Sequence, residues 1–118
     1  MLVVDDDYDI ASLIKISLEK MGLSVSSFTD PSLALEEFSK KPSDYELVIS
    51  DIRMPSMNGY EFVKHVKKIN PEVNVILMTA FEIENKEFYS ILPSIKINGF
   101  LRKPFSITEL NDIIRKIR

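Results

Sequence analysis

The stretch LVISDIRMPSMNG, residues 47–59, decides the fold because it joins a strand pattern, an acid and a loop pattern without a gap. The three aliphatic residues near its start are typical of a buried strand. Pro55 and Gly59 near its end are typical of a loop. Asp51 stands where the strand ends and the loop begins. An acid there could be only the polar end of a strand, so its meaning depends on whether other strand ends carry matching groups.

Short apolar runs alternate with helical patterns along the rest of the chain. The sequence predicts strands over residues 2–4, 23–28, 45–50, 73–78 and 99–101. Apolar residues at helical spacing follow each strand, although Pro93 makes the helix after the fourth strand irregular. This alternation predicts an α/β fold. We expect a flavodoxin-like, doubly wound five-stranded parallel sheet, a (βα)5 arrangement with strand order 2-1-3-4-5, because right-handed crossovers cover both of its faces.

Three helix starts carry capping signals. Asp30 stands before Pro31, which suits the first position of a helix. Ser106 and Glu109 have the spacing of a capping box at the start of the last helix. Asp7 is expected to cap the first helix, which gives this acid a structural role rather than a metal-binding one.

Length and composition bound the class of protein. With 118 residues, the whole chain, 1–118, suits one compact domain. The chain has no cysteine, which excludes disulfides, thiolate catalysis and cysteine-based zinc sites. A net charge of −3 argues against direct nucleic-acid binding spread over the domain. No apolar run is long enough to cross a membrane, and the acidic start lacks a signal-peptide pattern, so a cytoplasmic location without a membrane partner is expected.

Polar side chains stand at the carboxyl ends of four predicted strands. Asp5 and Asp6 follow the first strand, Asp51 ends the third, Thr79 ends the fourth and Lys103 follows the fifth. Open parallel sheets bind their ligands beyond this edge, at the point where the strand order reverses. Because the first and third strands are neighbours in the expected order, the three carboxylates should converge.

A converging set of this kind has a definite chemistry. Clustered carboxylates repel one another, and a hard divalent cation such as Mg²⁺ relieves that repulsion. Lys103 adds a point charge suited to phosphate, and Thr79 adds a hydroxyl donor. The set therefore indicates magnesium-assisted phosphoryl transfer onto an aspartate.

Four motifs carry a resemblance to a known family. In chain order, VVDDD, VISDIRMPSMNGYEF, VILMTA and GFLRKPF resemble the receiver domain of two-component response regulators, over essentially the whole chain. The resemblance implies that Asp51 is the phosphoacceptor, and that the donor is a phosphohistidine on a sensor histidine kinase or a phosphotransfer protein. It also implies a Mg²⁺ site, where Mn²⁺ could substitute. The implied metal ligands are Asp5, Asp6, Asp51 and the backbone carbonyl of Arg53, and the implied phosphoryl contacts are Thr79 and Lys103.

The same resemblance implies a switch. Thr79 would turn toward the phosphoryl group and Phe100 would swing inward, which remodels the surface of the fourth helix, fifth strand and last helix. Phe100 lacks the hydroxyl of the tyrosine often found there, so its coupling would depend on packing alone. A downstream effector domain or protein would bind this surface, and phosphorylation could drive homodimer formation. Arg53 and Phe81 flank the acceptor in the family's geometry, and their bulk would hinder the hydrolytic water and prolong the phosphoryl state.

Chemistry of this kind modifies the protein itself, so we do not expect an enzyme that turns over an external substrate. The alternative is a receiver-like binding module that works without phosphorylation, for which Phe100 and the irregular region around Pro93 leave room. A phosphatase resembling the haloacid dehalogenase family is disfavoured, because Arg53 stands where that family has a second acid. The chain is expected to be either a stand-alone receiver or the receiver part of a longer regulator.

Overall fold

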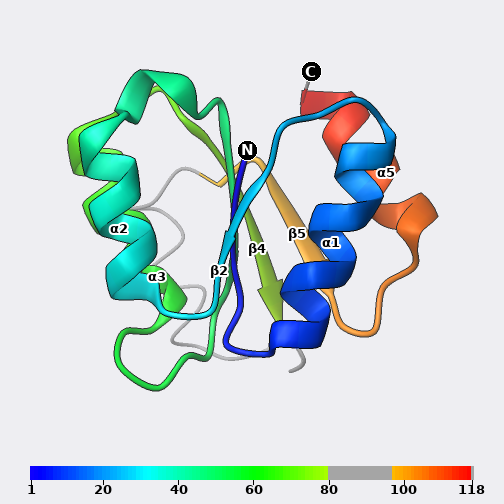
Figure 1. Ribbon diagram of the computed structural model, residues 1–118, viewed down its shortest axis with the longest axis horizontal. Coiled ribbons are helices and arrows are strands. Elements are labelled where there is room, and N and C mark those ends of the chain that lie inside the picture. The colour runs from blue at the N-terminus through cyan, green and yellow to red at the C-terminus, as the bar shows by residue number, and fades with distance from the viewer. Residues whose placement is uncertain (80–96, 118) are drawn as a thin grey trace.

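The computed structural model describes residues 1–79 and 97–117. In chain order the elements are β1 (Leu2–Val4), α1 (Tyr8–Lys20), β2 (Ser26–Phe28), α2 (Pro31–Lys40), the 3₁₀ turn η1 (Pro42–Asp44), β3 (Leu47–Asp51), α3 (Gly59–Ile69), β4 (Asn74–Thr79), β5 (Gly99–Arg102) and α5 (Ile107–Ile117). The strands form one parallel sheet in the order β2-β1-β3-β4-β5. Figure 1 shows α2 and α3 on one face of this sheet and α1 and α5 on the other. The predicted α/β class and strand order are confirmed.

Each face of the sheet carries its own hydrophobic core. On the α2–α3 side, Phe38 and Phe62 are fully buried against the strands. On the α1–α5 side, Leu18 is buried in a second cluster. Successive strand residues point to opposite faces, so Val48 belongs to the first core and Ile49 to the second. Burial on both faces explains why the strands appear in the sequence as continuous apolar runs.

The predicted helix caps are present. Asp7 caps α1, because its Oδ1 accepts from the backbone N–H of Asp9 at 3.0 Å. Asp30 caps α2 with Pro31 inside the first turn. Ser106 Oγ accepts from a backbone N–H in the first turn of α5, at 3.1 Å. Each bond satisfies one of the donors that a helix start leaves unpaired.

Strand β2 is shorter than the predicted strand over residues 23–28. The reason lies in how α1 ends. Gly22 adopts φ of +86°, and the N–H of Leu23 donates back to Leu18 O at 3.2 Å. Leu23 therefore belongs to the end of the helix rather than to the strand. The η1 turn before β3 was not predicted, and the helix expected after β4 lies outside the described residues.

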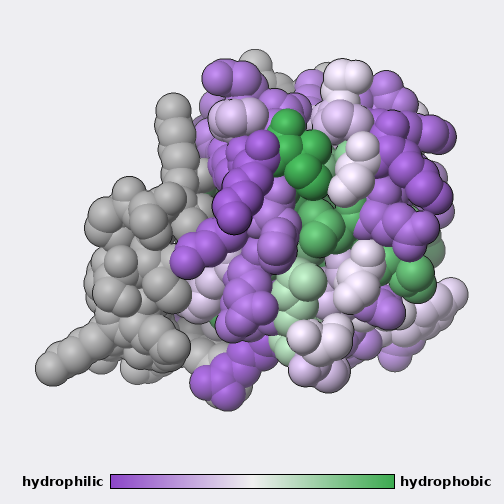
Figure 2. Space-filling view, turned by 90° about the vertical axis from the view of Figure 1, so that its left-hand side faces the viewer, coloured by the Kyte–Doolittle hydropathy of each residue, from purple (hydrophilic) through white to green (hydrophobic). Residues whose placement is uncertain are grey.

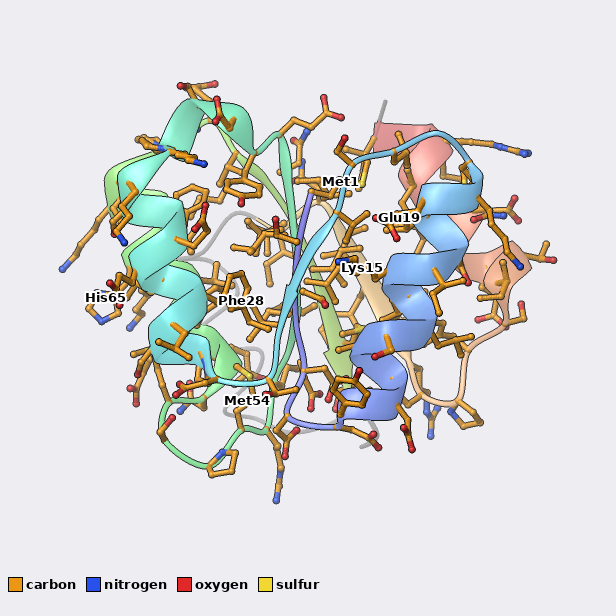
Figure 3. All side chains as sticks on the ribbon, viewed as in Figure 1. Met1, Lys15, Glu19, Phe28, Met54 and His65 are labelled. Atoms are coloured by element: carbon orange, nitrogen blue, oxygen red, sulfur yellow. The ribbon has the colours of Figure 1, made fainter. Side chains whose placement is uncertain are left out.

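The outer face of α2 and α3 is largely hydrophilic. Figure 2 shows a narrow apolar strip on this face between hydrophilic side chains. The side chain of His65 is exposed on α3 and points away from the sheet in Figure 3. Among the described residues, no helix has the length and apolar character needed to cross a membrane.

Candidate functional site

The carboxyl ends of the strands bring the predicted residues to one edge of the sheet. This edge is the lower one in Figure 1, toward which the arrowhead of β4 points. Asp5 follows β1, Asp51 is the last residue of β3, and Thr79 is the last residue of β4. Lys103 directly follows β5. Because β1 and β3 are paired neighbours, Asp5 and Asp51 lie next to each other.

Three carboxylates form the centre of the edge. Asp5, Asp6 and Asp51 each offer an oxygen, and these oxygens all lie within 4.8 Å of one another. Asp5 is fully buried, Asp51 is 7% exposed and Asp6 is exposed. The cluster is therefore closed toward the protein and open on the side of Asp6.

Lys103 reaches this cluster from the residue that follows β5. Its Nζ lies 2.7 Å from Asp5 Oδ2 and 3.5 Å from Asp51 Oδ2. Burial lowers the pKa of Lys103, but the hydrogen bond that Lys103 donates to Asp5 and the charges of both carboxylates outweigh burial and raise the pKa above its ordinary value. Lys103 is thus a cation held between two acids, and the peptide bond after it is cis.

The two buried carboxyl groups have raised pKa values. Burial is the main cause for Asp51, and the negative charge of Asp5 adds to it, so that the pKa of Asp51 reaches about 6 although Lys103 opposes the shift. Burial also raises the pKa of Asp5, against the hydrogen bonds from Lys103 and from the Asp7 N–H. Both carboxyl groups therefore ionise at some expense in free energy, which an additional cation would relieve.

Backbone amides orient both buried carboxylates. The N–H of Asp7 donates to Asp5 Oδ1 at 2.9 Å, and the N–H of Ile52 donates to Asp51 Oδ1 at 3.0 Å. In each carboxylate Oδ1 accepts a hydrogen bond from a backbone N–H, while Oδ2 faces Lys103. The oxygens of both carboxylates consequently have distinct surroundings.

The donor set suits a hard divalent cation. Mg²⁺ prefers oxygen ligands, and burial, with the negative charge of Asp5 added to it, raises the pKa of Asp51, so a bound cation would favour the ionised carboxylates. Asp5, Asp6 and Asp51 therefore fit a magnesium site at this edge. Arg53, whose carbonyl was predicted as a further ligand, lies exposed in the loop after β3.

The remaining predicted residues differ in where they lie. Thr79 is 5% exposed at the end of β4, on the same edge as the carboxylates. Phe100 is half-buried in β5 and packs against the core on the α2–α3 side. Phe81 lies outside the described residues. The roles of these three residues stay predictions.

Two polar groups at the edge were missed by the sequence analysis. The Ser50 hydroxyl is fully buried and donates to the carbonyl oxygen of Asp51 at 2.9 Å. The Ile52 N–H contacts the carboxylate of Asp51, as described above. A serine in an otherwise aliphatic strand was a visible signal for the first group, whereas a backbone amide leaves none in a sequence.

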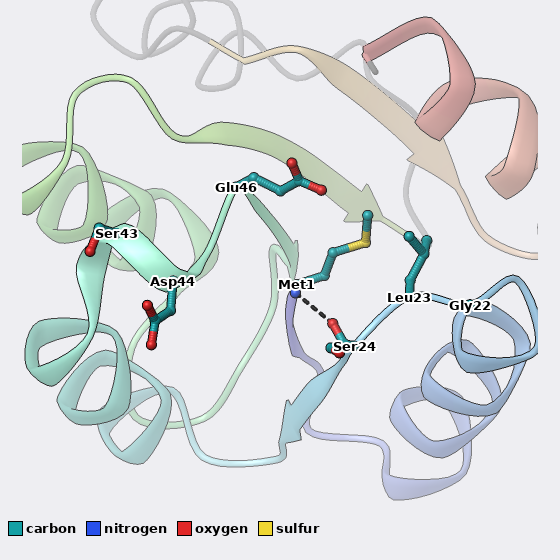
Figure 4. Close-up of a pocket in the computed structure, with 7 residues that line it drawn as sticks. All are labelled: Met1, Gly22, Leu23, Ser24, Ser43, Asp44 and Glu46. Carbon is teal, nitrogen blue, oxygen red and sulfur yellow. Dashed lines mark hydrogen bonds between the residues drawn. The ribbon is translucent and has the colours of Figure 1, made fainter.

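The hollows on the surface of the described residues include two near the ends of the strands. One, of about 370 Å³, lies at the amino ends of the strands and is shown in Figure 4. There the amino group of Met1 donates to Ser24 O at 2.7 Å. The other, of about 510 Å³, is an apolar groove between α1 and the β5–α5 loop, and Lys103 forms part of its wall. Only the second hollow adjoins the acidic cluster.

The sheet order and the acidic cluster at its carboxyl edge together define the CheY-like class of flavodoxin-like folds. The chain belongs to the response regulator receiver domain family, whose model matches residues 1–115. The resemblance found in the sequence motifs is confirmed. Because response regulators are components of two-component signalling, the family also places the chain in that class of system.

Individual relatives agree with this assignment. The chain is 31% identical to the response regulator SaeR of Staphylococcus aureus (strain USA300) over 110 residues, 93% of this chain and 46% of SaeR. It therefore spans about half the length of the curated relatives it matches. The chemotaxis protein CheY4 of Vibrio cholerae has a TM-score of 0.88 at 27% identity, covering 99% of this chain and 96% of CheY4. Response regulator protein TrrA of Thermotoga maritima, solved in complex with Mg(2+)-BeF, has a TM-score of 0.83 at 31% identity, with coverage of 99% and 96%.

Proposed function

We propose that the chain is a phosphorylation-controlled switch, in which Asp51 accepts a phosphoryl group from the phosphohistidine of a sensor histidine kinase or phosphotransfer protein. The observation that carries the proposal is the placement of Asp51 at the sheet edge, beside Asp5 and 3.5 Å from the ammonium of Lys103. Family membership supports the same chemistry.

The proposed step is a direct transfer. An oxygen of Asp51 forms a bond to phosphorus while the P–N bond of the donor breaks and leaves its electron pair on the imidazole nitrogen. The product is a mixed anhydride of aspartate and phosphate. Attack by water later splits this anhydride, which restores the carboxylate and releases inorganic phosphate. The chain turns over no external metabolite in this scheme, so we propose a switch rather than an enzyme.

The acidic cluster would supply the metal site for this step. Asp5, Asp6, Asp51 and the carbonyl of Arg53 would hold Mg²⁺, or Mn²⁺ in its place. A bound divalent cation offsets the negative charge that gathers when a phosphoryl group meets carboxylates. The similarity to TrrA, whose structure is of a Mg(2+)-BeF complex, supports this assignment.

Two side chains would contact the transferred group. Lys103 Nζ already lies 3.5 Å from Asp51 Oδ2, so its charge can pair with a phosphoryl oxygen after a small movement. Thr79 ends the neighbouring strand on the same edge and would donate its hydroxyl. Movement of Thr79, followed by repacking of Phe100 within β5, would carry the change to the surface that an effector domain or protein binds.

The test is the mass of the intact protein after incubation with phosphoramidate, with Mg²⁺ and with a chelator. We expect one phosphoryl adduct that requires Mg²⁺ and is absent in Asp51→Asn. Asp9→Asn, an exposed acid outside the cluster, serves as the matched control and should be modified like the wild type. Absence of the adduct while Mg²⁺ binds would favour a binding module that works without phosphorylation.

A further inference from the structure

The peptide group that follows the acceptor carboxylate is held from two sides. On one side, the buried Ser50 Oγ donates to the carbonyl oxygen of Asp51 at 2.9 Å. On the other side, Gly59 at the start of α3 packs against the same carbonyl. A Cβ atom on Gly59 would overlap Asp51 O and lie 2.8 Å from Ile52 Cα, closer than real Cβ contacts allow. We call this pair, Ser50 and Gly59, the carbonyl clamp.

Gly59 also binds the next peptide group along the chain. Its N–H donates to Ile52 O at 2.7 Å. Both carbonyls that flank the backbone of Ile52 are thus in contact with Gly59, which joins the first residue of α3 to the end of β3. Only a glycine allows an approach this close.

The orientation of this peptide group fixes the acceptor. The N–H of Ile52 belongs to the same peptide plane as the clamped carbonyl, and it donates to Met78 O at 3.0 Å and to Asp51 Oδ1 at 3.0 Å. A rotation of the plane would move this donor away from Oδ1. With Oδ1 held, Oδ2 is the oxygen that faces Lys103.

We propose that Ser50 and Gly59 are positioning residues for phosphoryl transfer, because the carbonyl clamp sets the Asp51–Ile52 peptide plane and so presents Asp51 Oδ2 to the phosphoryl donor. The inference rests on the proposed function of Asp51 and adds two residues that do not touch the phosphoryl group. Small errors in the placement of a reacting atom lower rates steeply, so loss of the clamp slows transfer even when the fold is retained.

Three substitutions test the clamp. Ser50→Ala removes the donor and leaves the buried Asp51 carbonyl without it, whereas Ser50→Thr keeps a hydroxyl in a residue suited to strands. Gly59→Ala adds the methyl group that overlaps Asp51 O. Gly22→Ala is the matched control, because its φ of +86° makes alanine strained while a Cβ there meets nothing within 4 Å.

Two measurements are made on each variant. The first is the rate of phosphoryl uptake from phosphoramidate at saturating Mg²⁺. The second is the chemical shift and hydrogen-exchange rate of the Ile52 amide in NMR spectra, which report its bond to Asp51 Oδ1. We expect Ser50→Ala and Gly59→Ala to slow uptake by about tenfold or more and to move the Ile52 amide signal. Ser50→Thr should recover most of the rate, and Gly22→Ala should lose stability but keep the wild-type rate.

The proposal would be overturned if Ser50→Ala took up the phosphoryl group at the wild-type rate and kept the wild-type Ile52 amide signal. It would also be overturned if Gly22→Ala lost as much rate as the clamp variants. If Gly59→Ala does not fold, Ser50→Ala and Ser50→Thr decide the outcome alone. If the wild type accepts no phosphoryl group, the proposed function fails. The Ile52 amide then still shows whether the clamp orients the Asp51 carboxylate, and an unchanged signal in Ser50→Ala overturns the clamp separately.

Discussion

At Asp51 and Asp5 the proposed function opposes the stability of the metal-free fold. Both carboxyl groups are buried side by side, and their burial raises both pKa values. A buried charge without a full set of partners destabilises a fold, and the single positive charge of Lys103 is shared between the two acids. The site therefore keeps a surplus of negative charge, which a bound divalent cation would offset.

Asp51→Asn should stabilise the metal-free protein at neutral pH. The fold raises the pKa of Asp51 from its ordinary value near 3.8 to about 6. Between these values the folded protein binds this proton more tightly than the unfolded chain does, so the contribution of Asp51 to stability is present at low pH and is lost as the pH rises through about 6. The stability difference between the variant and the wild type should grow over this interval, by on the order of 2 kcal/mol.

Urea unfolding in a chelator, from pH 4.5 to pH 7.5, measures this difference. Because other carboxylates titrate in both proteins, the variant-minus-wild-type difference isolates Asp51. Asp9→Asn should show no such trend, since Asp9 is exposed. A difference that does not vary with pH would contradict the assigned shift.

Lys103→Met should destabilise the metal-free protein by about 3 kcal/mol at pH 7. Methionine keeps much of the volume but leaves the fully buried Asp5 without its charged partner, and removing one member of a buried pair is strongly unfavourable. Lys40→Met breaks an exposed pair with Glu36 and should change stability by less than about 0.5 kcal/mol. Thermal and urea unfolding measure both variants. Similar losses in the two would show that burial of Asp5 does not matter.

Among the elements, α3 contacts the end of β3, where Asp51 lies. Its first residue contacts the carbonyl of Asp51, and Asn58 before it caps the helix by accepting from Glu61 N–H at 2.9 Å. One short loop thus connects β3, the carbonyl predicted to bind the metal and the start of a helix. We therefore expect a change at the start of α3 to affect the placement of Asp51 through the backbone.

Asn58→Ala should lower the free energy of unfolding by about 1 kcal/mol, because a helix donor loses its cap. Ser39→Ala is the matched control. It also removes a side-chain hydrogen bond on a helix, from Ser39 Oγ to Leu35 O, but this bond lies inside α2 and alanine favours helix, so stability should change by less than about 0.5 kcal/mol. Urea unfolding compares the two. An Asn58→Ala protein as stable as Ser39→Ala would show that the cap contributes little.

The elements also show which features a sequence reveals. Strands β1, β3, β4 and β5 were predicted within a residue or two of their observed bounds, and burial on both faces makes β1, β3 and β4 largely apolar runs. The start of β2 was wrong, because the closing turn of α1 uses Leu23. The η1 turn was missed, because a single 3₁₀ turn has no periodic pattern.

For the whole molecule, the site follows from topology. The order β2-β1-β3-β4-β5 places the ends of β1 and β3 side by side. Lys103, which follows β5, lies on the same edge and contacts Asp5 there. This is why the acids and the lysine could be predicted from strand ends, although 98 residues separate Asp5 from Lys103 along the chain. The hydrogen bond from Ser50 to the Asp51 carbonyl and the contact of Gly59 with that carbonyl could not be predicted from the sequence, because both depend on the backbone conformation of the loop after β3.

Mg²⁺ should stabilise the whole fold through this site. A ligand that binds only the folded state adds RT ln(1 + [L]/Kd), which is about 2.7 kcal/mol at a concentration of 100 Kd. The variant Asp6→Asn distinguishes stabilisation by bound Mg²⁺ from a change in the stability of the metal-free protein. Asp6 is exposed, so the variant should keep the metal-free stability of the wild type within about 0.5 kcal/mol. It should lose most of the stabilisation by Mg²⁺, since a predicted ligand is gone.

Urea midpoints measured across a Mg²⁺ titration give the metal-free stability and the stabilisation by Mg²⁺ for the wild type, Asp6→Asn and Asp9→Asn. Asp9 lies on α1 outside the cluster, so its variant should respond to Mg²⁺ as the wild type does. An Asp6→Asn protein with the full magnesium response would place the metal elsewhere. If Asp9→Asn lost the magnesium response equally, the response would be a general effect of negative charge. A loss in Asp6→Asn alone, which we expect, would show that Mg²⁺ stabilises the fold through the three carboxylates at the sheet edge.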